Sequence, residues 1–101
     1  MQSSYPERFE RDMGTTEAEW LAALPRAIGP AGQWSLDGER SAVVHVGAGI
    51  LRISWTILPE RRIALLVMKR LAVSFEFQGV DAGQRLAFMK PFDLAMQRGG
   101  G

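Results

Sequence analysis

The stretch HVGAGILRISW (His45–Trp55) places small residues between two runs in which apolar and polar side chains alternate. Two glycines one residue apart could begin a phosphate-binding loop, but such a loop needs a third glycine and then a helix. Arg52 stands where that glycine should be, and ILRISW alternates as a strand does. The stretch therefore predicts a β-hairpin with its turn at the glycines.

The two-residue alternation extends outward from this hairpin over residues 33–78. Asp37-Gly38 is a preferred hairpin pair, and Pro59-Glu60 and Lys69-Arg70 mark further turns. These turns predict an antiparallel meander of four to five strands. Neither Lys69 nor Arg70 favours a turn conformation, so the alternative is that residues 62–78 form one long bent strand.

A helix is predicted on each side of the meander. Thr16 and Glu19 form a capping box before an amphipathic run that Gly29 ends. Asp81 and Gln84 open a second helix over residues 81–98, which we expect Pro91 to kink. The predicted fold is therefore α+β, with an N-terminal helix, the meander and a kinked C-terminal helix, and with both helices on one face of the sheet.

The chain has 101 residues, 47% of them hydrophobic, which is enough for one domain with a single core. We expect an N-terminal arm over residues 1–13, either a short helix or an unanchored segment. Residues 14–98 are predicted to form the single α+β domain, followed by a flexible glycine tail over residues 99–101.

The segment IALLVM (Ile63–Met68) is apolar on both sides whichever register the strands adopt. Two-residue turns would give the sheet a continuous apolar face beneath the helices, and they would place Ile57, Leu66 and Met68 on it. Alternate residues would then occupy the second face. A strand that is apolar on both sides needs cover on both sides. We therefore predict that the second face is covered by another subunit, by curvature of the same sheet or by an apolar ligand.

Several function classes lack the residues they need. The chain has no cysteine, so disulfides and thiolate metal sites are excluded, and its single histidine predicts no metal site. No cofactor motif is present. The longest apolar run is far shorter than a membrane span, and the polar N-terminal residues do not resemble a signal peptide. The expected localisation is cytoplasmic.

The charges are unevenly spread. Residues 1–41 carry seven acidic residues and four arginines, whereas residues 42–101 carry eight basic residues and four acidic ones. The two halves can attract each other within the fold, or the basic half can offer a surface to an acidic partner.

The leading hypothesis is a non-enzymatic domain that forms a homodimer or binds another protein through the second face of its sheet. Its interface candidates are Trp34, Val43, Ile63, Leu65 and Val67. A first alternative is binding of nucleic acid or an acidic partner through Arg52, Arg61, Arg62, Lys69 and Arg70. A second is a small ligand-binding protein or enzyme whose pocket between helices and sheet involves His45, Trp55 or Asp93.

Overall fold

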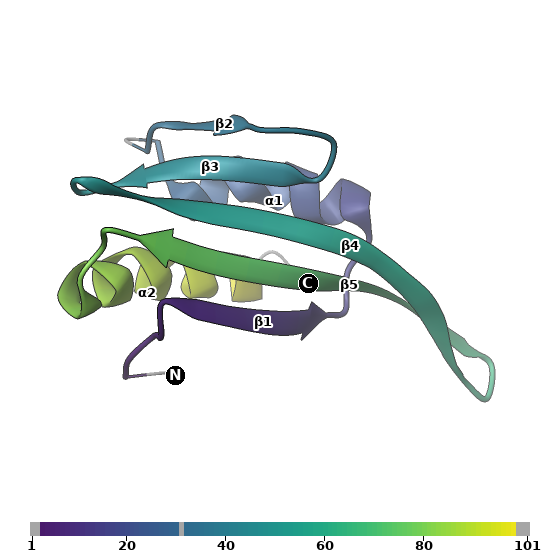
Figure 1. Ribbon diagram of the computed structural model, residues 1–101. Coiled ribbons are helices and arrows are strands. Elements are labelled where there is room, and N and C mark those ends of the chain that lie inside the picture. The colour runs from purple at the N-terminus through teal and green to yellow at the C-terminus, as the bar shows by residue number, and fades with distance from the viewer. Residues whose placement is uncertain (1–2, 31, 99–101) are drawn as a thin grey trace.

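The computed structural model describes residues 3–30 and 32–98 (Figure 1). The predicted glycine tail, residues 99–101, lies outside the described residues. The elements follow the chain in the order β1 (Arg8–Met13), α1 (Glu17–Ile28), β2 (Trp34–Leu36), β3 (Ser41–Val46), β4 (Gly49–Ile63), β5 (Leu66–Gln78) and α2 (Ala82–Arg98).

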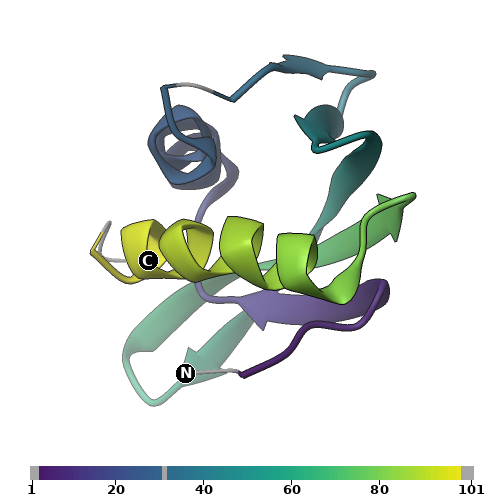
Figure 2. The ribbon, with the colours of Figure 1, turned by 90° about the vertical axis from the view of Figure 1, so that its left-hand side faces the viewer.

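The strands form one antiparallel sheet in the order β1-β5-β4-β3-β2. Strands β2 to β5 follow one another as a meander, and β1 joins it at the edge beside β5. Both helices lie on the same face of this sheet (Figure 2), and the other face carries no helix. The predicted α+β class and the placement of both helices on one face are confirmed.

Both helices begin where their capping residues predict. The Glu19 backbone N–H donates to the Thr16 hydroxyl, and the Glu19 carboxylate accepts from the Thr16 N–H. At α2 the Gln84 N–H donates to the Asp81 carboxylate at 2.8 Å. Helix α1 continues through Pro25 and α2 through Pro91, each as one element.

The hairpin predicted at the glycines joins β3 to β4. Gly47 has a φ of 58°, a conformation that glycine adopts without steric cost, and it turns the chain together with Ala48. A two-residue turn at Ala48-Gly49 would pair Val44 with Ile53, but the turn lies one residue earlier, and Val44 pairs with Leu51. This slip of two positions keeps each side chain on its predicted face, because side chains alternate with a period of two.

The β2–β3 connection is longer than the predicted two-residue turn. Strand β2 ends at Leu36 and β3 begins at Ser41, and Trp34 pairs with Val44, which is buried. Trp34 therefore lies on the helix face, where it packs against the core and is half-buried. Its predicted place on the second face is wrong, because the longer loop changes the register by an odd number of residues.

The five-strand version of the meander is also wrong. Strands β4 and β5 meet in one turn at residues 64–65, and Ala64 has a φ of 54°. Pro59-Glu60 is instead an irregularity within β4, because Leu58 pairs with Arg70 and Arg61 with Met68, which leaves two β4 residues opposite one. Lys69 and Arg70 lie inside β5, so residues 66–78 form one strand, as the alternative reading proposed in part.

The N-terminal segment forms neither a helix nor an unanchored arm over residues 8–13. These residues form β1, in which Phe9 pairs with Phe75 and Met13 with Leu71. Glu7 and Arg11 are four residues apart, a spacing that favours a helix, but this spacing does not decide the structure. Burial of Phe9 against the edge of the sheet contributes more than an exposed ion pair, and its ring stacks on Phe75 at 4.8 Å.

The core lies between the sheet and the two helices. Trp20 and Leu24 of α1 and Met89 and Phe92 of α2 meet alternate residues of the three central strands, which are Ala42, Val44, Val46, Leu51, Ile53, Trp55, Leu71, Val73, Phe75 and Phe77. Most of the apolar face predicted from the alternation is therefore confirmed. Ile57, Leu66 and Met68 are the exceptions, because all three are exposed.

Candidate interaction site

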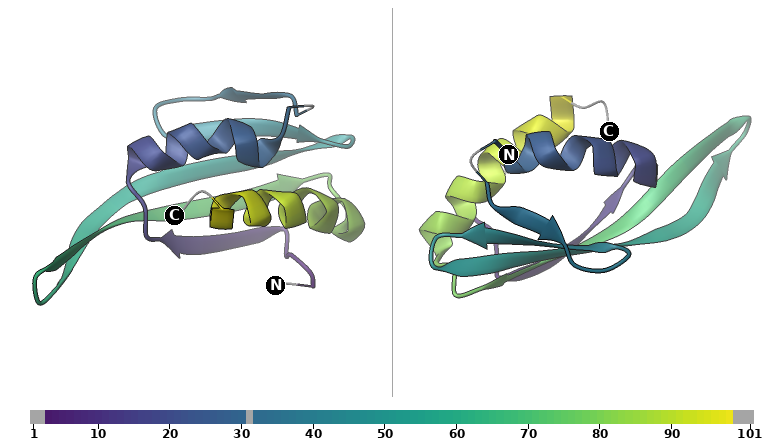
Figure 3. Two further views of the ribbon diagram at one scale, coloured as in Figure 1. Left: turned by 180° about the vertical axis from the view of Figure 1, so that it is seen from behind. Right: turned by 90° about the horizontal axis from the view of Figure 1, so that it is seen from above.

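Strands β4 and β5 continue well beyond the strands on either side of them. Pairing of β3 with β4 ends at Ser41 and Ser54, and pairing of β1 with β5 ends at Met13 and Leu71. We call residues 57–70 the extension. It is a two-stranded ribbon that projects from the body of the sheet and curves toward the side of the helices (Figures 1 and 3).

The register assigns the side chains of the extension to two sides. Residues of β5 alternate, so Leu66 and Met68 share the helix-free side with Arg70, together with their partners Ile63 and Arg61. Val67 lies on the opposite side with its partner Arg62. Ile63, Leu65 and Val67 were predicted on one face. That grouping is wrong, because Ile63 and Val67 lie on opposite sides and Leu65 is in the turn.

The extension carries most of the exposed large hydrophobic side chains of the described chain. Six of the nine are located there: Ile57, Ile63, Leu65, Leu66, Val67 and Met68. Leu65 is 99% exposed, and the others each expose 43% or more of their surface. Such a concentration of exposed apolar side chains is unusual on monomeric proteins and is typical of sites of association.

A groove of about 400 Å³ lies where the extension leaves the body of the protein. One wall is the start of α1, from Thr15 to Glu17, and the other is formed by residues 57–60 of β4 and 69–71 of β5. Its apolar lining includes Ile57, Pro59 and Leu71, and charged side chains complete the rim. The groove therefore combines a partly apolar floor with polar edges, as protein-binding sites commonly do.

Glu17 fixes the helical wall of this groove. Its carboxylate accepts a hydrogen bond from Trp55 Nε1 at 2.8 Å and one from Arg40 Nε at 2.9 Å. Together these contacts join α1 to β4 and to the β2–β3 loop. The hydrogen bond from Trp55, and then the Arg40 guanidinium, hold the pKa of Glu17 below its ordinary value despite the opposing effect of desolvation.

The lowered pKa of Glu17 predicts a loss of stability in acid. A carboxylate whose pKa is lower in the folded state stabilises the fold above its unfolded pKa, which is about 4.3. That contribution is lost as the pH falls through the folded value. In urea unfolding from pH 7 to pH 2, Glu17→Gln is expected to unfold more easily than wild type at neutral pH and to lose less stability in acid.

Glu39→Gln is the matched control, because the Glu39 side chain is 86% exposed and also forms an ion pair with Arg40, at 3.3 Å. We expect this variant to follow the wild-type curve. Equal slopes of stability against pH for wild type and Glu17→Gln would contradict the assignment.

Four of the five basic candidates lie on the extension. Lys69 and Arg62 are paired with Glu60, and Arg70 with Asp12. Among the residues that the structure describes, Arg61 makes no salt bridge. The fifth candidate, Arg52, lies on the body of the sheet and is paired with Asp37 at 2.5 Å. The basic residues thus form one cluster on the extension, much of whose charge is neutralised by acidic neighbours.

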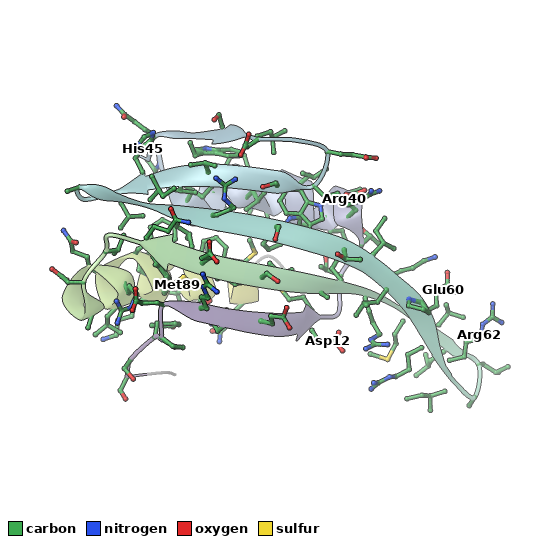
Figure 4. The ribbon with its side chains drawn as sticks, viewed as in Figure 1. Asp12, Arg40, His45, Glu60, Arg62 and Met89 are labelled. Carbon is green, nitrogen blue, oxygen red and sulfur yellow. The ribbon has the colours of Figure 1, made fainter. Side chains whose placement is uncertain are left out.

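The three pocket candidates do not meet. His45 is exposed at one end of the sheet. Glu60 and Arg62 lie on the extension, at the opposite end (Figure 4). Trp55 is buried in the core against Trp20. Asp93 binds Tyr5 and Arg11 from the N-terminal segment. The groove beside the extension is lined by none of these three residues.

The cluster around Asp93 was not predicted from the sequence. Its carboxylate accepts hydrogen bonds from the Tyr5 hydroxyl and the Arg11 guanidinium, both at 2.5 Å. Burial raises the pKa of Tyr5, and the hydrogen bond to Asp93 raises it further. The Arg11 guanidinium also lies 5.2 Å from the Phe9 ring and 5.4 Å from the Phe75 ring. This arrangement anchors the N-terminal segment and β1 to α2.

The helix-free face of the sheet body is largely polar. Glu76 is the cross-strand neighbour of both Arg8 and Arg52, and its carboxylate lies 2.9 Å from Arg8. Ser74 donates a hydrogen bond to Glu10. Val43 lies on this face as predicted and is half-buried. A cover over the whole second face was predicted because residues 63–68 are apolar on both sides. These residues lie in the extension, so the body of the sheet does not need such a cover.

Comparisons with protein-family models, with curated proteins and with solved structures found no match. Within the described residues, no helix is long and apolar enough to cross a membrane. Over the same part of the chain, no three histidine, aspartate or glutamate side chains are grouped as a metal site would require.

Proposed function

We propose that this protein acts by self-association, and that the extension is its interaction surface. The observation that carries the proposal is the concentration of exposed apolar side chains in residues 57–70, on both sides of the ribbon and at its turn. An isolated two-stranded hairpin is only marginally stable in water. A ribbon with these side chains gains stability when a protein surface covers it.

Burial of the apolar side chains of the extension supplies the driving force for association. Fully burying one leucine or isoleucine side chain contributes about 1.5–3 kcal/mol. In a symmetric dimer each residue is buried twice, so the six exposed side chains of the extension offset much of the entropy lost on association. Outside the extension, the described chain exposes fewer large hydrophobic side chains, namely Leu21, Leu36 and Leu94.

A nucleic-acid partner has weaker support. Phosphate binding needs lysines and arginines that can exchange counterions for phosphates. On the extension Lys69, Arg62 and Arg70 already face carboxylates of this chain, and Arg52 lies elsewhere. Protein association uses the apolar side chains and the paired charges together.

Sedimentation at increasing protein concentration tests the proposal. Wild type is expected to form dimers, and Leu66→Ser is expected to weaken the dimer about a hundredfold, since two copies each lose roughly 1.5 kcal/mol. The control is Leu36→Ser, because Leu36 is 57% exposed against 66% for Leu66 but lies at the opposite edge of the sheet. A wild-type monomer at every concentration, or equal effects of the two variants, would overturn the proposal.

A further inference from the structure

Strand β5 has an edge without a partner strand inside the extension. Along the body of the sheet this edge is covered by β1, which begins opposite Glu76 and ends opposite Leu71. Among the described strands none pairs with the same edge from Leu66 to Arg70. Exposed backbone N–H and C=O groups of this kind are a template for another strand.

The other edge of the extension is less suited to pairing. It belongs to β4, where Pro59 lacks a backbone N–H and the register shifts between Leu58 and Arg61. Proline and bulges are devices that block strand addition at an edge. The β5 edge contains neither, and its sequence LVMKR begins with strand-forming residues.

We propose that two copies of the chain pair through these β5 edges, antiparallel and about a two-fold axis at Met68. This inference rests on the proposed self-association and specifies its geometry. Met68 of one copy lies opposite Met68 of the other, and Leu66 of each lies opposite Arg70 of its partner. The two extensions thereby form a continuous four-stranded ribbon, a form of strand addition.

The same register brings each turn to the groove of the other copy. The run from Leu65 to Leu71 spans about 20 Å in extended form. In this register Leu65 of the partner copy comes level with Leu71, where the free edge of β5 ends because Met13 of β1 pairs with Leu71. Thr15 and Leu71 line the groove, whose volume of about 400 Å³ has room for the leucine side chain.

The charges favour the antiparallel arrangement. Near the turn the extension carries Arg61 and Arg62, with Glu60 beside Arg62, whereas the carboxylates of Asp12 and Glu17 lie at its base. Antiparallel pairing brings the arginines of one copy to the acidic base of the other. A tip-to-tip contact would instead bring four arginines together, and like charges in contact oppose association.

Disulfide trapping tests this geometry cleanly, because the chain has no cysteine of its own. Directly opposed residues of an antiparallel pair have their Cβ atoms about 5 Å apart, close to disulfide geometry. Under mild oxidation Met68→Cys is expected to form a covalent dimer about tenfold faster than Arg61→Cys, because pairing raises the effective concentration of its thiols. Arg61 is the matched control, since it pairs with Met68 inside the hairpin but lies on β4.

Leu65→Cys separates this arrangement from a contact between tips. We expect it to link slowly, like Arg61→Cys. If Leu65→Cys or Arg61→Cys links as fast as Met68→Cys while sedimentation shows a dimer sensitive to Leu66→Ser, the β5 pairing is overturned and self-association through the extension stands. If wild type does not dimerise in sedimentation, the proposed function fails as well.

Discussion

Replacing Asp93 with alanine is expected to lower the free energy of unfolding by about 2–4 kcal/mol, because it removes the carboxylate that the largely buried Arg11 guanidinium binds. The side chains of Arg11 and Asp93 are only 24% and 18% exposed. The Tyr5 hydroxyl loses its acceptor at the same time. Alanine favours the helical conformation at this position of α2, so propensity does not add to the loss. Urea unfolding followed by tryptophan fluorescence measures the effect.

The matched control for this variant is Asp37→Ala. Asp37 and Arg52 are also separated by 2.5 Å, but their side chains are 53% and 41% exposed. Exposed ion pairs contribute about 0–1 kcal/mol, so we expect a small change. Equal losses for the two aspartates would contradict the assignment of Asp93 as the anchor of β1.

The second large effect is expected at Gly49, where β4 begins. A Cβ atom built on Gly49 would lie 2.2 Å from the backbone oxygen of Gln78 and 2.5 Å from that of Gly79. Backbone atoms of a paired strand cannot yield as the end of a flexible side chain does. Gly49→Ala is therefore expected to lower the free energy of unfolding by about 2–3 kcal/mol through overpacking, as measured by the denaturant midpoint.

Gly14→Ala provides the comparison, because a Cβ atom on Gly14 meets nothing within 4 Å. Both changes lower the conformational entropy of the unfolded chain equally, so this entropic contribution to stability cancels when the two variants are compared. We expect Gly14→Ala to be neutral or slightly stabilising. A similar loss at both positions would show that backbone entropy, and not the close approach of β4 to β5, governs the effect.

Local chemistry explains which parts of the fold the sequence predicts. The Thr16–Glu19 capping box and the turn at Gly47 are interactions between neighbouring residues, and both occur where the pattern places them. The turn at Ala64-Leu65 has no such signal, because alanine rarely adopts a positive φ. Pro59-Glu60 has a strong turn signal but lies in a bulge, since β4 and β5 remain paired beyond it.

The parts that were not predicted depend on residues far apart in the chain. Phe9, Arg11 and Met13 alternate as a strand does, and this signal was present in the sequence. The charge spacing around them also fitted a helix, and only their contacts with β5 and α2 decide between the two. The sequence also shows that residues 63–68, in the extension, are apolar on both sides of the strand. Its position outside the sheet depends on where β1 and β3 end, which no local pattern encodes.

The position of β1 has a consequence for the order of folding. Its partner β5 is about sixty residues away along the chain, whereas each strand of the meander folds onto its immediate neighbour. Contacts between distant residues form late, because closing a long loop costs entropy first. Until β1 docks, the edge of β5 is unpaired from Leu66 to Gln78, and an unpaired strand edge is a template for aggregation.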